Sequence, residues 1–115
     1  LEDAPAAKAR RDAWIAARGV ADVYVVIADE GRRADALGVV QGLREVGWRA
    51  EYAFGELKVG KQFQAAELAG ARFAVVIGSE WPEVKVKRLA DRQERMLAAS
   101  DLYQQLTAWD LERLH

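Results

Sequence analysis

Two short apolar runs constrain this chain most strongly. Residues 23–28 read Val-Tyr-Val-Val-Ile-Ala and residues 73–77 read Phe-Ala-Val-Val-Ile, with no charged residue in either run. A strand with one face in water alternates apolar and polar residues, whereas a strand buried on both faces is apolar throughout. The two runs therefore predict inner strands of a sheet that is covered by helices, as in α/β domains.

The residues between these runs predict two helices and one further strand. Residues 34–46 repeat apolar side chains with a helical period, at Leu37, Val40, Leu43 and Val46, and Gly47 follows as a stop. Gly38 and Gly42 lie one turn apart within this helix. Each weakens a helix by about 1 kcal/mol relative to alanine, so we expect close approach of the helix to the sheet to compensate.

Residues 48–54 alternate and predict the second strand. The second helix is expected to begin at Glu56 or Leu57 and to carry apolar and polar side chains on opposite sides. We expect its apolar face to contain Val59, Phe63, Ala66 and Gly70, and its polar side Lys58, Lys61, Gln64 and Glu67.

The pattern changes after the second buried run. Residues 84–89 alternate, residues 93–98 form another short strand pattern, and residues 90–92 between them predict a hairpin turn. Ser100 is the expected N-cap of a last helix that buries Leu102, Leu106 and Trp109. The sequence thus predicts an α/β fold with a five-stranded mixed sheet and three helices.

The first residues are interpreted separately. Residues 1–19 predict a linker helix and residues 20–115 the folded domain. The basic side chains of this linker either touch phosphates or simply keep it soluble: Lys8, Arg10, Arg11 and Arg18.

Composition excludes several classes of chemistry. The chain has 115 residues, enough for one domain, and 51% of them are hydrophobic. It has no cysteine, and its one histidine, His115, is the last residue, so thiolate, histidine-base and Cys/His metal chemistry are excluded. No run approaches the length of a membrane span. The absence of cysteine fits a cytoplasmic protein, which is what we expect. With a net charge of −1, any nucleic-acid surface must be a local patch.

One motif resembles a phosphate-binding loop. Residues 55–61 match the spacing Gly-x-x-x-x-Gly-Lys and lie between a strand and a helix. The next residue is Gln62, however, and the serine or threonine hydroxyl that binds magnesium in such loops is missing. Nucleotide hydrolysis is therefore disfavoured.

Two other features have alternative interpretations. Lys85, Lys87 and Arg88 either contact a ligand or protect a sheet-edge strand from aggregation. Trp81, which precedes Pro82 in a turn, either stacks on an unpaired base or covers the end of the core.

Most polar candidates fall near strand ends or at the adjacent helix start. In open α/β sheets ligands bind at strand ends, where the topology switches. A mixture of carboxylate, amide, lysine and tryptophan suits the edges and faces of single-stranded bases better than small anions or metals. The candidates are Glu56, Lys61, Gln64, Glu80, Trp81 and Lys87.

Five segments in this order resemble the C-terminal anticodon-binding domain of class IIa aminoacyl-tRNA synthetases, histidyl-tRNA synthetases in particular. One is the run at 23–28, and the next two are Leu-Arg-Glu-Val-Gly-Trp-Arg-Ala-Glu at 43–51 and Leu-Lys-Val-Gly-Lys-Gln-Phe-Gln-Ala-Ala at 57–66. The last two are Gly-Ala-Arg-Phe-Ala-Val-Val-Ile-Gly at 70–78 and Val-Lys-Val-Lys-Arg-Leu at 84–89. Asp91-Arg92 stands where the family commonly has Thr-Gly.

The resemblance implies a domain that binds the anticodon loop of histidine tRNA and has no catalytic residue, metal or cofactor of its own. A separate catalytic domain of the parent enzyme, expected to be a homodimer, would use ATP and Mg. The same resemblance implies anticodon contacts from Glu56, Lys61, Gln64, Glu80, Trp81 and Lys87, with Asp29 in the first turn as a further candidate.

Two other functions are compatible with the sequence. One is a synthetase-like regulatory or dimerisation module that no longer recognises tRNA, and the other is a flavodoxin-like domain that binds a small molecule. Polar side chains such as Glu56, Lys61 and Lys87 at strand ends favour RNA, because a protein-contact surface is expected to be more apolar there.

Overall fold

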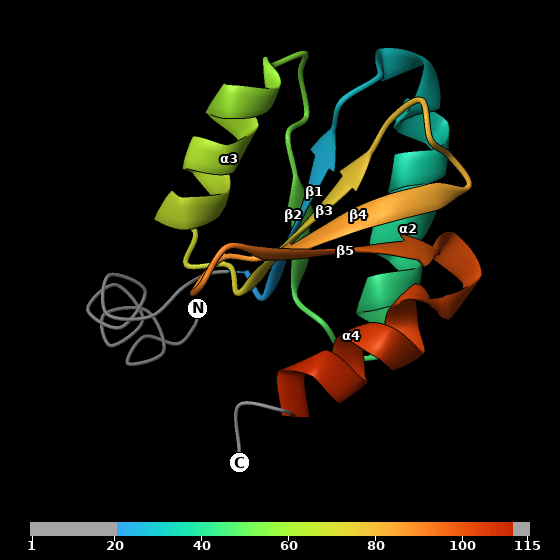
Figure 1. Ribbon diagram of the computed structural model, residues 1–115. Coiled ribbons are helices and arrows are strands. Elements are labelled where there is room, and N and C mark those ends of the chain that lie inside the picture. The colour runs from blue at the N-terminus through green and yellow to red at the C-terminus, as the bar shows by residue number, and fades with distance from the viewer. Residues whose placement is uncertain (1–20, 112–115) are drawn as a thin grey trace, which may run out of the picture.

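The computed structural model describes residues 21–111, and the predicted linker helix at residues 1–19 lies outside them. Figure 1 shows one sheet with α3 on one face and α2 and α4 on the other. The strand order is β2-β1-β3-β4-β5; β1, β2 and β3 run parallel, and β4 and β5 are antiparallel to their neighbours. The five-stranded mixed sheet with three helices is thus confirmed.

The two apolar runs form the centre of the sheet. β1 (Val23–Ile27) is buried at every position and pairs along its whole length with β3 (Phe73–Ile77). Their alternate residues face two different layers. Val23, Val25 and Ile27 pack in the larger core beneath α2 and α4, whereas Tyr24 and Val26 pack beneath α3. Burial on both faces explains why neither run alternates.

The second strand is shorter than the alternation predicts. β2 comprises only Ala50–Tyr52 and pairs with the first half of β1. The chain then leaves the sheet through residues 53–58, which have neither helical nor strand structure. Ile27, near the end of β1, therefore has no strand partner on this side.

α2 (Arg33–Glu45) follows the short 3-10 turn η2 (Glu30–Arg32), and its buried face overlaps the predicted one only in part. Its buried positions are Ala36, Val39, Val40 and Leu43, whereas Leu37 and Val46 are exposed. The predicted stripe was correct at Val40 and Leu43 and wrong at Leu37 and Val46, because it followed the large apolar residues. The small side chain of Ala36 packs completely within the core, and the apolar face is rotated accordingly.

The two glycines of α2 differ, and neither has the predicted role against the sheet. A Cβ on Gly38 would meet nothing within 4 Å. A Cβ on Gly42 would collide with the hydroxyl of Tyr103 in α4, so the close approach at this position is between helices.

α3 (Val59–Leu68) starts later than predicted, with Lys58 as its N-cap residue. Its fully buried residues are Gln62 and Ala66; Phe63 is half-buried and Val59 is exposed. The expected face was therefore correct at Ala66 and missed Gln62, a polar residue on the buried side of the helix.

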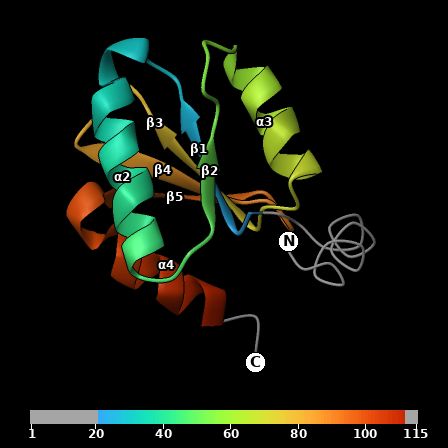
Figure 2. The same cartoon turned by 180° about the vertical axis from the view of Figure 1, so that it is seen from behind.

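β4 (Glu83–Arg88) and β5 (Gln93–Ala98) form the predicted hairpin. β4 lies between β3 and β5, so Lys85 and Lys87 are not on an edge strand, and the edge-protection interpretation is wrong. Val84 and Val86 pack in the larger core, so Lys85 and Lys87, which alternate with them, lie on the opposite face of the sheet. Lys87 contacts Phe63 of α3 there, and Figure 2 shows α3 on one face of the sheet and α2 and α4 on the other.

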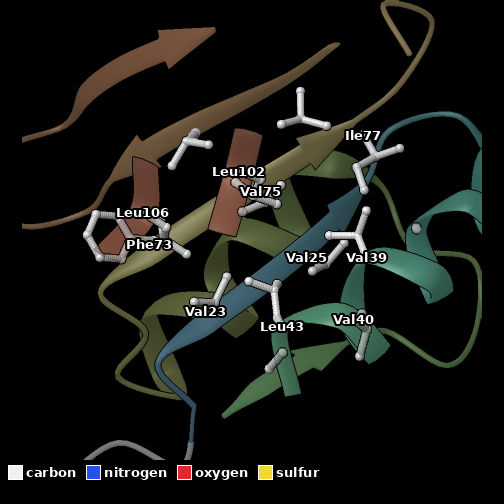
Figure 3. Close-up of a cluster of buried hydrophobic side chains, with 14 of the residues drawn as sticks. Val23, Val25, Val39, Val40, Leu43, Phe73, Val75, Ile77, Leu102 and Leu106 are labelled. Atoms are coloured by element: carbon white, nitrogen blue, oxygen red, sulfur yellow. The ribbon is translucent and has the colours of Figure 1, made fainter. Parts of the chain in front are cut away.

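The last helix is α4 (Leu102–Leu111), and it is preceded by the 3-10 turn η3 (Ala99–Asp101). Ser100 lies inside this turn, so the predicted N-cap is misplaced. Leu102, Leu106 and Trp109 are buried as predicted, and Figure 3 shows Leu102 and Leu106 above Val75 and Phe73. Between residues 21 and 111, no helix combines the length and the apolar character needed to cross a bilayer.

Candidate functional site

The connections after the three parallel strands leave from the same end of the sheet, at the top in Figure 1. They are the link from β1 to η2, the loop from β2 to α3 and the turn from β3 to β4. This is the carboxyl edge of the parallel strands, where ligands commonly bind in open α/β sheets. Polar side chains at this edge are therefore the candidates for a binding site.

The loop between β2 and α3 is held from one side by Arg33. Its guanidinium donates to the backbone carbonyls of Ala53 at 2.8 Å, Gly55 at 3.2 Å and Phe54 at 3.5 Å. Glu30 orients the same guanidinium through two hydrogen bonds of 2.8 and 3.0 Å. These hydrogen bonds from Arg33 lower the pKa of Glu30, so the carboxylate remains charged at neutral pH.

Gln62 holds the other end of the loop. Its Oε1 accepts a hydrogen bond from the Ile27 N–H at 2.7 Å, and its Nε2 donates to the Ile27 carbonyl and the Leu57 carbonyl, both at 2.8 Å. The side-chain amide thus replaces the strand neighbour that β1 loses where β2 ends. Gln62 is 1% exposed and is the only buried polar or charged residue among residues 21–111. Gln62, which directly follows the phosphate-loop motif at residues 55–61, therefore holds the loop in place structurally.

A cleft of about 310 Å³ opens between these two attachments. Its walls are Ile27 and Ala28 at the end of β1, Glu30, and residues 56–59 of the loop. Glu56 and Lys58 expose a carboxylate and an ammonium group here, and neither side chain has a hydrogen bond or ion pair within residues 21–111. The amino-terminal end of α3 adjoins the cleft at Val59 and adds the partial positive charge of its N–H groups.

Glu80 reaches the same edge from the turn after β3. A Cβ on Gly78 would lie 3.2 Å from the Ala28 Cβ and 3.5 Å from Glu80 Oε1. The carboxylate therefore lies over Gly78 and close to Ala28, which lines the cleft. Glu56 and Glu80 thus both lie at this edge of the sheet, and of the two only Glu56 lines the cleft.

Trp81, the next residue, packs against the core. It is half-buried and packs against the larger core, on the side of α2 and α4. Of the two interpretations of this side chain, the structure favours the one in which it covers the end of the core.

Asp29, Lys61 and Gln64 differ in what they contact. Asp29 caps η2, with its Oδ1 accepting from the Gly31 N–H at 2.9 Å, so this carboxylate serves local structure. Lys61 and Gln64 are exposed on α3, and neither lines the cleft.

Lys87 lies away from the other candidates. It pairs in register with Ala74, three residues before the end of β3 and hence about 10 Å from the carboxyl edge. Its Nζ lies 5.2 Å from the centre of the Phe63 ring and 3.9 Å from Glu94 Oε2, and its side chain is 21% exposed. Lys87 thus contacts α3 through Phe63 and β5 through Glu94, away from the cleft.

The sequence interpretation missed Lys58, Arg33 and Gln62 as contributors to this edge. Lys58 was assigned to the polar side of a helix that in fact begins one residue later. The available signal for Gln62 was its spacing of four residues from Ala66, which places both on one helix face. For Arg33 no local pattern indicates the carbonyls that it holds twenty or more residues away.

Comparison with known proteins defines the class of domain. Residues 22–109 match the family described as "Anticodon binding domain", and the chain belongs to this family. The resemblance inferred from its five sequence segments is thereby confirmed.

Histidine–tRNA ligases are among its relatives. The chain is 36% identical over 84 residues to the Koribacter versatilis enzyme and 37% identical over 84 residues to one from Lactobacillus delbrueckii subsp. bulgaricus. These matches cover 70% of this chain but only 19% and 20% of the relatives, so the chain spans about a fifth of their length.

Solved structures agree with the fold. Histidyl-tRNA synthetase from Nostoc sp. PCC 7120 superposes with a TM-score of 0.70 at 31% identity, covering 84% of this chain and 23% of that chain. The RNA-binding domain of threonyl-tRNA synthetase from Cryptosporidium parvum Iowa II gives a TM-score of 0.68 at 16% identity, over 83% and 24% of the two chains, and shares the fold.

Proposed function

We propose that this domain binds the anticodon loop of histidine tRNA through the carboxyl edge of its parallel strands. The observation that carries the proposal is the cleft lined by Glu56 and Lys58, whose side chains make no hydrogen bond or ion pair in the part of the chain that the structure describes. Arg33 lies near enough to Glu56 to interact with it electrostatically. The similarity to histidine–tRNA ligases supports the choice of tRNA.

The chemistry of these side chains suits an unstacked base. An ionised carboxylate only accepts hydrogen bonds, so Glu56 and Glu80 favour a base edge that presents N–H donors and disfavour one that presents carbonyl oxygens. Lys58 is placed to contact a phosphate or a base carbonyl. Such contacts to splayed bases are the usual basis of sequence-specific RNA recognition.

Within a longer protein this domain would act beside a separate catalytic domain. By analogy with the histidine–tRNA ligases, that parent would be a cytoplasmic, dimeric enzyme using ATP and Mg, and this domain would supply tRNA recognition without catalysis.

The experiment is a binding titration of the 115-residue chain with histidine tRNA and with the same tRNA carrying a changed anticodon. Phosphate contacts weaken steeply with salt, so both titrations are run at about 50 mM and about 200 mM salt. We expect tighter binding to the unaltered tRNA at both. Equal affinity for the two would contradict anticodon recognition.

Substitution of Lys87 tests the extent of the interface. We expect Lys87→Ala to weaken binding of the unaltered tRNA while the thermal unfolding temperature stays the same. The contacts with Phe63 and Glu94 offer a structural alternative. A loss of thermal stability that matches the loss of affinity would make Lys87 a structural residue.

A module that contacts only protein is the second candidate. The observation in its favour is an apolar groove of about 660 Å³ at the opposite edge of the sheet, lined in part by Phe73, Leu89 and Trp109. For such a module the same titrations give no binding to either tRNA.

A further inference from the structure

Phe54 is an exposed aromatic residue in the loop beside the cleft. Its side chain is 82% exposed, but exposure alone does not mark a site, because single apolar residues are common on protein surfaces. Leu68 at the end of α3 is 89% exposed and adjoins no such cleft. What distinguishes Phe54 is how it is held and what lies next to it.

The backbone around Phe54 is fixed. Arg33 donates hydrogen bonds to the carbonyl of Phe54 and to those of the residues on either side of it. The Phe54 ring also meets Tyr52 edge-on, with the ring centres 5.1 Å apart and the planes at 76°. A ring held at its backbone and against a neighbouring ring loses little further freedom when a ligand binds to it.

Phe54 also belongs to the loop that supplies charged groups to the cleft wall. It precedes Glu56 by two residues, and Glu30, which orients Arg33, is itself part of the cleft wall. Leu57 and Val59 add further exposed apolar surface to the same loop and helix start. An aromatic ring next to polar groups is the combination that single-stranded nucleic-acid sites use to stack a base and read its edge.

We propose, on the basis of the function proposed above, that the Phe54 ring is the stacking surface for one splayed anticodon base whose edge enters the adjacent cleft. Stacking on a base was one of the two sequence interpretations of Trp81, but that ring packs against the core. Phe54 offers a ring face to solvent at the same edge of the sheet, and its contact with a base needs neither charge nor a particular base identity.

The test compares Phe54→Ala, Phe54→Trp and the control Leu68→Ala in the full chain. Their ligand is an RNA hairpin with the histidine tRNA anticodon loop, in which 2-aminopurine replaces each anticodon base in turn. We expect Phe54→Ala to weaken binding about 5- to 100-fold, the range typical of losing one stacked base, with an unchanged dependence on salt. Phe54→Trp should keep the affinity close to that of the wild type, because tryptophan also offers a ring to stack on. Leu68→Ala should change the affinity by no more than about twofold.

Fluorescence identifies the stacked base. 2-Aminopurine is quenched when it stacks, so in the wild type one position should be quenched on binding, and Phe54→Ala should abolish that quenching. Wild-type affinity in Phe54→Ala, with the wild type still preferring the unaltered anticodon, would overturn the stacking role alone. Failure of the wild type to prefer the unaltered anticodon would instead remove the proposed function, so the two failures are distinguishable.

Discussion

The two ends of the parallel strands use charged residues differently. The residues just before β1, β2 and β3 are Asp22, Arg49 and Arg72, and Asp22 pairs with both arginines. Asp22 Oδ1 lies 3.1 Å from Arg49 Nη2 and 3.3 Å from Arg72 Nη2, and Arg72 Nη1 lies 2.7 Å from Asp110. After the same strands, Glu56, Lys58 and Glu80 have no such side-chain partners among residues 21–111.

This difference separates charges that build the fold from charges that remain available. At the amino end, ion pairs join the starts of the three strands to one another and to α4. At the carboxyl end the structural work is done by Arg33 and Gln62, which bind backbone groups and hold the loop in place. The backbone of the loop is therefore held in place, while the side chains of Glu56 and Lys58 form no ion pair, and this arrangement suits a binding surface.

The largest expected effect is that of Gln62→Leu. It leaves the Ile27 N–H, the Ile27 carbonyl and the Leu57 carbonyl without their partner, and each buried unpaired group costs about 1–3 kcal/mol. We expect the free energy of unfolding in urea to fall by about 3–5 kcal/mol. Gln64→Leu on the exposed side of α3 is the control and should change it by less than about 0.5 kcal/mol.

A loss of less than about 1 kcal/mol in Gln62→Leu would contradict a major role of the Gln62 amide at the carboxyl edge of the parallel strands. Such a result would mean that the loop rearranges to satisfy these groups itself.

Asp22→Asn should have the next largest effect, at the opposite end. Partial burial acts to raise the pKa of Asp22, but hydrogen bonds from the Arg49 side chain and backbone, with the charges of Arg49 and Arg72, outweigh it and lower the pKa. We expect a loss of about 2 kcal/mol at pH 7, measured by urea unfolding.

The pH dependence follows from the direction of this shift. A carboxyl group with a lowered folded-state pKa stabilises the protein above its ordinary pKa of 3.8, and the contribution disappears as the pH falls through the lower folded value. The difference between wild type and Asp22→Asn should therefore shrink below about pH 4. Asp35→Asn, which breaks an exposed pair with Arg32, should cost about 0–1 kcal/mol; an equal loss there would remove the contrast.

Lys58→Ala should affect binding rather than stability. We expect the affinity for histidine tRNA to fall severalfold and the magnitude of the slope of log affinity against log salt to decrease by about 1, as for the loss of one phosphate contact. The thermal unfolding temperature should stay unchanged, because the Lys58 side chain has no partner in the described part of the chain. Unaltered affinity together with an unaltered slope would exclude Lys58 from the interface.

The smallest expected effect is that of Arg92→Gly in the hairpin near the amino end. Arg92 has φ +62°, a left-handed conformation that costs a residue with a Cβ about 1–2 kcal/mol, whereas glycine adopts it without strain. The greater freedom of glycine in the unfolded chain offsets part of this gain. We expect a net gain of up to about 1 kcal/mol in the free energy of unfolding, and Arg92→Ala serves as the control that keeps the strain.

The residue pattern predicted the strands better than the orientation of the helices. β1 and β3 are buried on both faces, so their apolar runs have one interpretation, and both were correct. The face of α2 was misjudged because a pattern of large residues does not show where a small one, Ala36, allows closer packing. Trp81 was ambiguous for a similar reason, because a tryptophan in a turn suits both a core end and a ligand.

The sequence likewise predicted only part of the candidate site. The sequence placed Glu56 and Glu80 at strand ends, because chain order alone puts the ends of parallel strands at one edge. It did not separate Lys87 from them, because that distance depends on the register of β4 against β3.

The sequence by itself determined the number and order of the elements and the family, because burial on two faces, helical period and turn residues are local signals. Only the tertiary structure decided that Gln62 is buried, that Arg33 holds the loop and that Phe54 is the exposed ring beside the cleft. Each of these depends on contacts between segments at least twenty residues apart, and such contacts arise only when the sheet brings those segments together.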